Sequence, residues 1–378
     1  MTMARVITLL CVGVLGASSA RAAELPTRIE LYTMGPGDDV FEAFGHAALC
    51  VISDENPRGL CYNYGTADYA DPAGLFWGVL RGRAMFEVAS MPLPLMLQAY
   101  VEDDRSVYRQ KLDLSPDAAD AMATRLDHDN QPENRAYLYN HYRENCATRL
   151  RDHLDAVADG ALARGSTRPY DETYRELTAR GFASSFLLLA GMEVLVGRQV
   201  DRTPTVWEAM FLPDVLRAEV ARTFKSAPEA FHLRTLPDRS LSMGAGRAAL
   251  ILLAVALTLL LGLAAVLRST WVFGLGLVAA GLTLGVLALT ADGLAAVALL
   301  PELRRNEVLL VLLPTDLGLM FLRGRTLKVY LAARGVLLVL VAAGLLAGVL
   351  VQPMWPVFAL AAGPVAMALF GAYRVDQV

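Results

Sequence analysis

The last third of the chain is almost continuously apolar, and this feature limits the possible folds more than any other. Residues 247–373 consist mainly of Leu, Val, Ala and Gly. A helix needs about 20 apolar residues to cross the hydrocarbon core of a bilayer. We therefore expect residues 247–378 to form a membrane domain of about five transmembrane helices.

The expected spans and the charges between them predict a topology. The spans cover residues 248–267, 271–290, 307–322, 335–351 and 354–373. Basic residues favour the cytoplasmic side of a membrane. They follow the first, third and last spans, at Arg268, Arg323, Arg325, Lys328, Arg334 and Arg374, whereas Arg304 and Arg305 lie in an outer loop and oppose this order. With the N-terminal domain outside the cytoplasm, five spans leave the C-terminus in the cytoplasm.

Residues 1–23 have the features of a secretory signal peptide. Arg5 precedes an apolar run over residues 6–16, and residues 20–22 form a small-residue cleavage pattern. The mature protein would begin near Ala23 or Glu24. Together with the apolar third of the chain, this pattern predicts a multi-pass protein of the inner membrane with its N-terminal domain in the periplasm.

Residues 24–246 are charged and numerous enough to form a soluble domain with its own core. The whole chain has a net charge of −4 and no basic stretch that would indicate nucleic-acid binding. Of the four cysteines, Cys11 lies in the leader, so the chain is not a disulfide-rich scaffold. No histidines and cysteines have the spacing of a zinc site, and we expect neither a metal nor another cofactor.

Cys146 is the candidate nucleophile because it lies at the predicted first turn of a helix. Asn145 before it is a good N-cap, and apolar residues recur at helical spacing over residues 147–157. The unpaired N–H groups of such a helix end, with Arg149 and Arg151 nearby, are expected to lower the pKa of the thiol. The alternative is a buried structural cysteine, which is a common environment for this residue type.

His46, at the start of a short strand-like stretch over residues 43–52, is the candidate base. A catalytic cysteine and histidine meet in space and not in sequence, so their separation is no objection. His141 is the main rival for this role. His128 lies in a polar loop, and His153 falls on the cysteine helix at a spacing that points it away from the thiol.

A second strand is predicted over residues 60–64, after a turn at residues 57–59. The two strands form an antiparallel hairpin in which Cys50 lies opposite Cys61. Because the periplasm is oxidising, this register predicts a disulfide between them.

The same register places Asn63 diagonally from His46 on one face of the sheet. Asn63 is therefore the candidate for the group that orients the imidazole. The alternatives are Tyr64, Asp68 after a small register shift, and a purely structural role for Asn63 as a turn former at the strand end.

The remaining stretches predict further elements. Residues 76–88 continue strand-like, and Ser115 with Pro116 begins a helix. The apolar stretch Phe182–Val196 is too short to cross a bilayer, and we expect a buried or interfacial helix there. Trp207 and Phe211 are candidates for lipid contact, with ordinary core packing as the alternative.

Four separated motifs together resemble a known family. They are Phe44-Gly45-His46-Ala47-Ala48, Tyr62-Asn63-Tyr64-Gly65-Thr66, Tyr100 with Arg105-Ser106-Val107, and Tyr137-Leu138-Tyr139-Asn140 with Asn145-Cys146-Ala147-Thr148-Arg149 and Asp152. In this order they resemble the Lnb-type N-terminal periplasmic domain over about residues 28–215. The resemblance implies an α+β fold of the circularly permuted, NlpC-type papain-like class, related to lecithin:retinol acyltransferase.

The family includes a bacterial lipoprotein N-acyltransferase, so the resemblance also implies an activity. His46 would deprotonate Cys146, which would take an acyl chain from a phospholipid as a thioester. The chain would pass to the N-terminal amine of a diacylglyceryl lipoprotein. Backbone N–H groups, helped by the side chain of Asn145 or Asn140, would stabilise the oxyanion. Arg105 or Arg149 would hold the donor phosphate.

Arg105 also follows three acidic residues, so a solvated ion pair is the alternative to phosphate binding. Two other functions are compatible with the sequence. One is a papain-fold hydrolase that cuts peptidoglycan peptides, and the other is a cell-envelope binding protein without catalytic activity. Five membrane spans argue against the first of these, and an intact Cys–His pair argues against the second.

Overall fold

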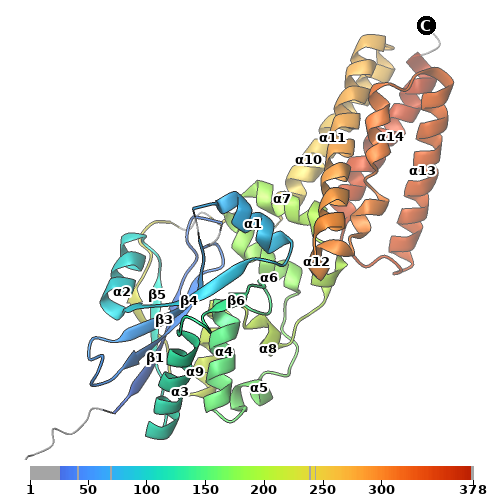
Figure 1. Cartoon of the computed structure of the whole chain (residues 1–378). Coiled ribbons are helices and arrows are strands. Elements are labelled where there is room, and N and C mark those ends of the chain that lie inside the picture. The colour runs from blue at the N-terminus through green and yellow to red at the C-terminus, as the bar shows by residue number, and fades with distance from the viewer. Residues whose placement is uncertain (1–25, 41, 69, 238–239, 243, 376–378) are drawn as a thin grey trace, which may run out of the picture.

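The computed structural model describes residues 26–375 except 41, 69, 238, 239 and 243, so the predicted signal peptide lies outside the described residues. Figure 1 shows a sheet covered by helices, joined at one end to a bundle of long helices that contains the C-terminal part of the chain. The expectation of an α+β domain followed by apolar helices is confirmed at this level.

Among the described residues, seven strands form one antiparallel sheet in the order β6-β4-β3-β2-β1-β5-β7. The strands are β1 Arg28–Met34, β2 His46–Ile52, β3 Leu60–Thr66, β4 Met85–Pro92, β5 Val107–Lys111, β6 Ala136–Leu138 and β7 Glu229–His232. The central strands β1, β2 and β3 are buried at nearly every position. They therefore have helices or loops over both faces.

Helices cover both faces of this sheet. They are α1 Pro72–Leu80, α2 Leu93–Glu102, α3 Pro116–Asp129, α4 Cys146–Val157, α5 Ala161–Gly165, α6 Tyr174–Gly181, α7 Phe186–Leu195, α8 Val206–Ala209 and α9 Pro213–Thr223. Short 3₁₀ helices, η1 Phe182–Ser184 and η2 Arg198–Asp201, flank α7. Helix α4 packs against β2 and β3, and this contact positions the candidate site.

The strand expected over residues 76–88 is wrong in its first part, because residues 72–80 form α1. Asp71 caps this helix by accepting a hydrogen bond from the N–H of Gly74 (2.9 Å), and Pro72 occupies its first turn. This cap and proline are helix-start signals that the apolar run behind them obscured. The strand β4 begins only at Met85.

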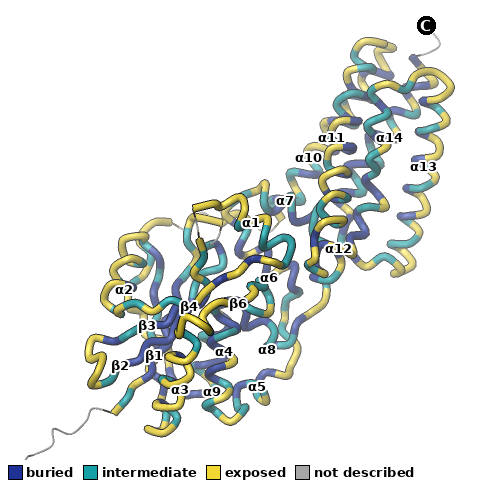
Figure 2. The backbone as a smooth tube through the Cα atoms, viewed as in Figure 1, coloured by how far each residue is buried: buried dark blue, intermediate teal, exposed yellow. Residues whose placement is uncertain are grey.

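Within the described residues, four helices are long and apolar enough to cross a membrane. They are α10 Ala245–Val266, α11 Thr270–Val297, α13 Gly324–Leu346 and α14 Trp355–Arg374, with the short α12 Pro301–Arg304 after α11. Exposed stretches alternate with buried ones along them (Figure 2). Apolar side chains such as Leu252, Val339 and Leu346, the last 90% exposed, point outward. Such a surface needs a lipid environment.

The third expected span, over residues 307–322, is not a transmembrane α-helix. It forms two 3₁₀ helices, η3 Glu307–Leu310 and η4 Pro314–Met320. Proline at position 314 has no backbone N–H and interrupts helical hydrogen bonding, which an apolarity count does not detect. The fourth expected span also starts earlier than predicted, at Gly324.

The interrupted segment nevertheless runs the length of the bundle. At the end near the sheet, Glu307 accepts hydrogen bonds from the backbone N–H groups of Val351 and Gln352 (2.9 and 2.8 Å). The segment leads into α13 at the far end of the bundle, where Lys328 Nζ, in the first turns of α13, lies 4.9 Å from the ring centre of Tyr373 in the last turn of α14. In the described part of the chain, the backbone thus passes along the bundle five times, once without an α-helix.

A non-helical pass inside a membrane must have its polar groups satisfied by protein. Here η4 packs closely on α11, where Gly281 and Gly285 leave room for the backbone of Asp316 and the side chain of Leu317. Lipid is therefore excluded from one side of the segment by α11.

A buried ion pair holds the other side of this segment. Arg334 of α13 donates two hydrogen bonds to Asp316 (2.8 Å each) and one to the carbonyl of Val311 (2.7 Å). The hydroxyl of Tyr330 also donates to Asp316 (2.6 Å). Asp316 is 0% and Arg334 2% exposed. The expectation that Arg334 lies in a cytoplasmic loop is therefore wrong.

Replacement of Asp316 by Ala should destabilise the bundle, because it leaves the buried guanidinium of Arg334 without its carboxylate. Breaking one partner of such a pair costs about 3–5 kcal/mol. We expect a lower Tm for the detergent-solubilised variant and partial recovery in the double variant Asp316→Leu, Arg334→Met. The exposed Arg325→Ala serves as control. A wild-type Tm for the single variant would contradict this assignment.

Candidate active site

Cys146 is the first residue of α4, as the sequence predicted, and a capping box fixes this helix start. The side chain of Asn145 accepts a hydrogen bond from the N–H of Thr148 (2.9 Å), and the hydroxyl of Thr148 accepts one from the N–H of Asn145 (2.8 Å). The Asn145 amide also donates to the carbonyls of His141 and Phe211 (2.9 and 2.8 Å). The position of Cys146 is therefore fixed by the hydrogen bonds of Asn145 before it and of Thr148 after it.

These contacts leave no role for the Asn145 side chain as an oxyanion donor in this structure, because both of its amide hydrogens are directed to carbonyls. Asn140 is not among the cavity-lining residues, and its side-chain oxygen accepts from the N–H groups of Tyr142 and Arg143 (3.1 Å each). Both residues build the loop before the cysteine. The expected oxyanion role of their side chains is corrected accordingly.

His46 is the first residue of β2, next to Cys146 in space. The N–H of Ala47, the following residue, hydrogen bonds to the sulfur of Cys146. Gly45 before it has φ of +77°, and a Cβ there would lie 2.5 Å from the carbonyl oxygen of Met34. Only glycine fits this turn into β2. His46 and Cys146 line the same cavity.

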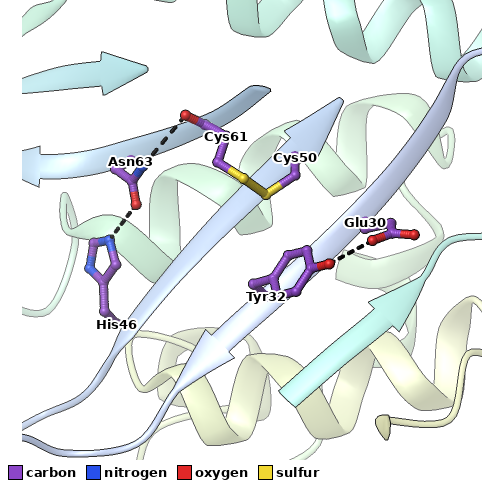
Figure 3. The surroundings of a disulfide bond; sticks show 6 residues. All are labelled: Glu30, Tyr32, His46, Cys50, Cys61 and Asn63. Atoms are coloured by element: carbon purple, nitrogen blue, oxygen red, sulfur yellow. Dashed lines mark hydrogen bonds between the residues drawn. A yellow bond between two sulfur atoms is a disulfide. The ribbon is translucent and has the colours of Figure 1, made fainter. Parts of the chain in front are cut away.

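Asn63 lies beside His46 through the expected hairpin register. Cys50 is opposite Cys61 and Ala48 is opposite Asn63. The structure contains a disulfide between the two cysteines, and the Asn63 side-chain oxygen lies 3.2 Å from Nε2 of His46 (Figure 3). With this amide oxygen as acceptor, Nε2 carries the proton and Nδ1 carries the basic lone pair.

The other candidates for the third group lie elsewhere. The hydroxyl of Tyr64 lies 2.7 Å from Nε2 of His153 and donates to Asp129 (2.9 Å), so it belongs to a separate buried network. Asp68 is exposed and accepts from the N–H of Ala70 (2.9 Å). Of the three alternatives, the structure brings only Asn63 to His46 within its described residues.

Burial keeps the candidate pair neutral. Desolvation, with a smaller effect of the charge on Arg105, lowers the pKa of His46 to about 4, although the hydrogen bond from His46 to Asn63 opposes this shift. Desolvation also raises the pKa of Cys146, and the N–H groups of Ala47 and Ala147 offset this only in part. The expectation of a lowered thiol pKa is therefore wrong, because burial outweighs the helix end.

His141 also lines the cavity. Its Nδ1 lies 3.3 Å from the hydroxyl of Tyr139, and its ring packs edge-on to Phe44 (4.2 Å between centroids). Burial lowers the pKa of His141 to about 4. It lacks a carboxamide or carboxylate partner among the described residues, which distinguishes it from His46.

The two candidate arginines lie in different environments. Arg105 is 2% exposed, donates to the carbonyl of Gly35 (3.1 Å) and pairs with Glu42 (3.1 Å). Its Nη2 has no partner in the part of the chain that the structure describes, and the residue lines the cavity. Arg149 instead lies 3.4 Å from both Glu144 and Asp129 and is not among the cavity-lining residues.

The cavity has a volume of about 1620 Å³ and lies between the sheet domain and the membrane bundle. It exceeds the roughly 300–1,000 Å³ of ordinary small-molecule pockets. Apolar residues of α1, α7 and α11 form much of its wall. Trp207 is not among the lining residues, whereas Phe211 belongs to the buried core and also lines the cavity.

Residues 22–180 match the family model of the Lnb N-terminal periplasmic domain. This part of the chain belongs to that family. No match was found among curated proteins or among solved structures. The matched residues of the Lnb-type domain include His46, Asn63, Arg105 and Cys146, whereas α7 and the membrane helices follow its end.

Sequence reasoning missed the cavity walls on either side of the Lnb-type domain's Cys–His pair. Phe76 and Trp77 of α1 were assigned to a strand, Leu289 of α11 to a membrane span without a site, and Gly293 of α11 fell in the loop expected after that span. The helix-start signal at Asp71 and Pro72 was the available indication for α1.

The raised pKa predicts how the thiol reacts with alkylating agents. A thiol with a raised pKa remains protonated to higher pH, and the thiolate is the reactive species. We expect alkylation of Cys146 by iodoacetamide to be slower at pH 7 than that of a free cysteine, which has a pKa of about 8.5, and to rise only at alkaline pH. Mass spectrometry of the modified peptide measures this rate, with the unfolded protein as control. Rapid alkylation already at pH 6 would indicate a preformed thiolate–imidazolium pair instead.

Proposed function

We propose that this protein is a membrane-bound thiol acyltransferase. It transfers an acyl chain from a phospholipid, through a thioester on Cys146, to the N-terminal amine of a diacylglyceryl lipoprotein. The observation that carries this proposal is the position of Cys146, beside the His46–Asn63 pair on the wall of a largely apolar cavity that reaches α11 of the membrane bundle. Membership of residues 22–180 in the Lnb family supports it.

The first half-reaction forms the thioester. His46 takes the thiol proton of Cys146 as the sulfur attacks the ester carbonyl, so the neutral pair becomes charged only during the reaction. The carbon–oxygen bond to glycerol then breaks, and His46 returns the proton to the departing alkoxide. Backbone N–H groups at the start of α4 are the proposed donors to the oxyanion, and each such donor contributes about 3 kcal/mol.

The second half-reaction forms the amide. The acceptor amine attacks the thioester carbonyl and gives a proton to His46, the carbon–sulfur bond breaks, and His46 returns a proton to the sulfur. Water competes with the amine at this step. The apolar walls of α1, α7 and α11 disfavour water near the thioester and so favour transfer over hydrolysis.

Arg105 is the proposed contact for the donor phosphate. Its unpartnered Nη2 lies at the same cavity as Cys146, and a guanidinium is suited to phosphate oxygens. Arg149 is not proposed for this role because it does not line the cavity and its two Nη atoms face Glu144 and Asp129.

The fold class proposed for the N-terminal domain is circularly permuted and papain-like. A histidine on an early strand of an antiparallel sheet, followed by a cysteine at a helix start, is the reverse of the papain order and supports this. Permutation changes the chain order but keeps the Cys–His contact.

The proposed location is the inner membrane, with the Lnb-type domain in the periplasm and the C-terminus in the cytoplasm. An odd number of membrane passes, five here, would leave the start of α10 and the C-terminus on opposite sides of the membrane. The far end of the bundle carries the basic residues Arg268, Arg323, Arg325, Lys328 and Arg374.

Reporter fusions test this topology. We expect a reporter that is active only in the periplasm to be inactive at the C-terminus and in the loop after α10, and active in the loop after α11. A C-terminal fusion that is active in the periplasm would mean that residues 307–322 do not cross the membrane.

An assay with purified protein tests the chemistry. With phospholipid, wild-type protein should gain one acyl mass on Cys146, and a diacylated lipopeptide with a free amine should discharge it as an amide. Cys146→Ser and His46→Ala should each abolish transfer, because general acid–base catalysis contributes about 10²–10⁴-fold and the nucleophile is obligatory. Mass spectrometry follows both half-reactions.

His141→Ala is the matched control for His46→Ala, since both histidines line the cavity, and it should retain transfer. N-acylation without added phospholipid would identify the lipopeptide's own glyceryl ester as the donor. Release of free fatty acid alone, or cleavage of peptidoglycan fragments, would replace the proposal by the hydrolase alternative, and no reaction with any of these substrates would favour a binding protein.

A further inference from the structure

We infer that the space between α7 and α11 is the binding site for the acyl chain of the donor lipid and limits the length of that chain. This inference rests on the proposed acyl transfer, and it adds where the chain binds and what selects it. The cavity that contains Cys146 and His46 continues between these two helices.

One face of each helix lines this space with the same spacing. The six residues are Leu187, Gly191 and Leu195 on α7, and Leu289, Gly293 and Val297 on α11. Positions four and eight residues apart fall on one side of a helix. The two apolar faces therefore form opposite walls, each with a glycine at its centre.

The two central glycines are not explained by helix packing. In the same bundle, a Cβ at Gly276, Gly285 or Gly371 would meet a side chain of a neighbouring element closer than 3 Å. A Cβ at Gly191 or Gly293 would meet no heavy atom within 4 Å. The missing side chains thus leave open space, and because both residues line the cavity, this space belongs to it.

The position of the groove along α11 matches the depth of an acyl chain. Residues 289–297 form the last part of the 28-residue helix, at the end next to the sheet domain, and extend over about 12 Å. An acyl chain from the adjacent half of the bilayer would stay in apolar surroundings on entering it. The carbonyl at its end would then lie toward Cys146.

An independent feature of the same cavity indicates an anionic group on the ligand. Arg105 is almost completely buried and pairs with Glu42 through Nη1, and its Nη2 lacks a hydrogen-bond partner among the described residues. An apolar groove at one wall and a cationic group at another fit an amphiphile with a negatively charged headgroup. A glycerophospholipid has this arrangement, with its ester between the two ends.

Filling the groove should change which chains are transferred. Gly293→Leu and Gly191→Leu each place a side chain in the open space, and we expect either variant to prefer short-chain over long-chain phospholipid by about tenfold or more relative to wild type. The measurement is the ratio of acyl masses on Cys146 after incubation with an equimolar mixture of the two lipids.

Gly274→Leu is the matched control. Gly274 lies on the same helix, also has no heavy atom within 4 Å of an added Cβ, and is not among the cavity-lining residues. It should keep the wild-type ratio. An unchanged ratio in both groove variants, with full acylation of Cys146, would overturn the groove assignment and leave the proposed acyl transfer intact.

A second measurement does not depend on turnover or on the folding of the leucine variants. A phospholipid with a diazirine on its acyl chain is added to the Cys146→Ser protein and irradiated. Crosslinks to the peptides covering residues 187–195 and 289–297 are expected. If these crosslinks appear but the wild-type protein never gains an acyl group on Cys146, the lipid site is supported and the proposed transfer is refuted. If the crosslinks are confined to the outer faces of α10 and α13, the site is refuted.

Discussion

The cavity exists because the sheet domain is fixed on the membrane bundle. This attachment depends on hydrogen bonds to the carbonyl groups at the C-terminal end of α7. The last carbonyls of a helix have no partners within it. Here Asn306 donates to the carbonyl of Val194 (2.7 Å), and Gln352 donates to that of Val196 (3.0 Å). Glu307, which is buried, accepts from Arg198 on the sheet-domain side (2.9 Å). Polar groups that would be costly to bury alone thus stabilise one relative position of the two parts.

The same burial that suits a lipid determines the state of the candidate catalytic pair. An apolar, enclosed site favours uncharged groups, so Cys146 remains a thiol and His46 a neutral imidazole. A preformed ion pair would need the solvent or charges that an acyl chain excludes. The contact between His46 and Asn63 then has a clear use, because it fixes the proton on Nε2 and leaves Nδ1 as the base.

Local signals in the sequence predicted much of the site, because each one acts between near neighbours. The Asn145 cap, the Ser115–Pro116 helix start and the pairing of Cys50 with Cys61 need only short-range rules. The failures depended on distant partners. Arg334 looked like a loop residue since Asp316, its partner, lies on another segment, and the pKa of Cys146 depends on burial by elements that its own helix does not show.

The non-helical pass of residues 307–322 was also mispredicted, because its conformation depends on contacts with distant parts of the membrane domain. Apolarity over residues 307–322 indicates that the segment lies in the bilayer but not its conformation, which is set by Pro314 and by the space that Gly281 and Gly285 provide.

The boundary of the family match separates the candidate catalytic residues from the two helices of the groove. Cys146, His46 and Asn63 lie within residues 22–180, whereas α7 and α11, which contribute the two glycines of the groove, come later in the chain. Substitutions in these helices can therefore change the shape of the cavity without altering the His46–Asn63 hydrogen bond or the hydrogen bond from Ala47 to Cys146. If the groove holds the acyl chain, selection of the chain and reaction of its carbonyl are separable properties, since they reside in elements that meet only at the cavity.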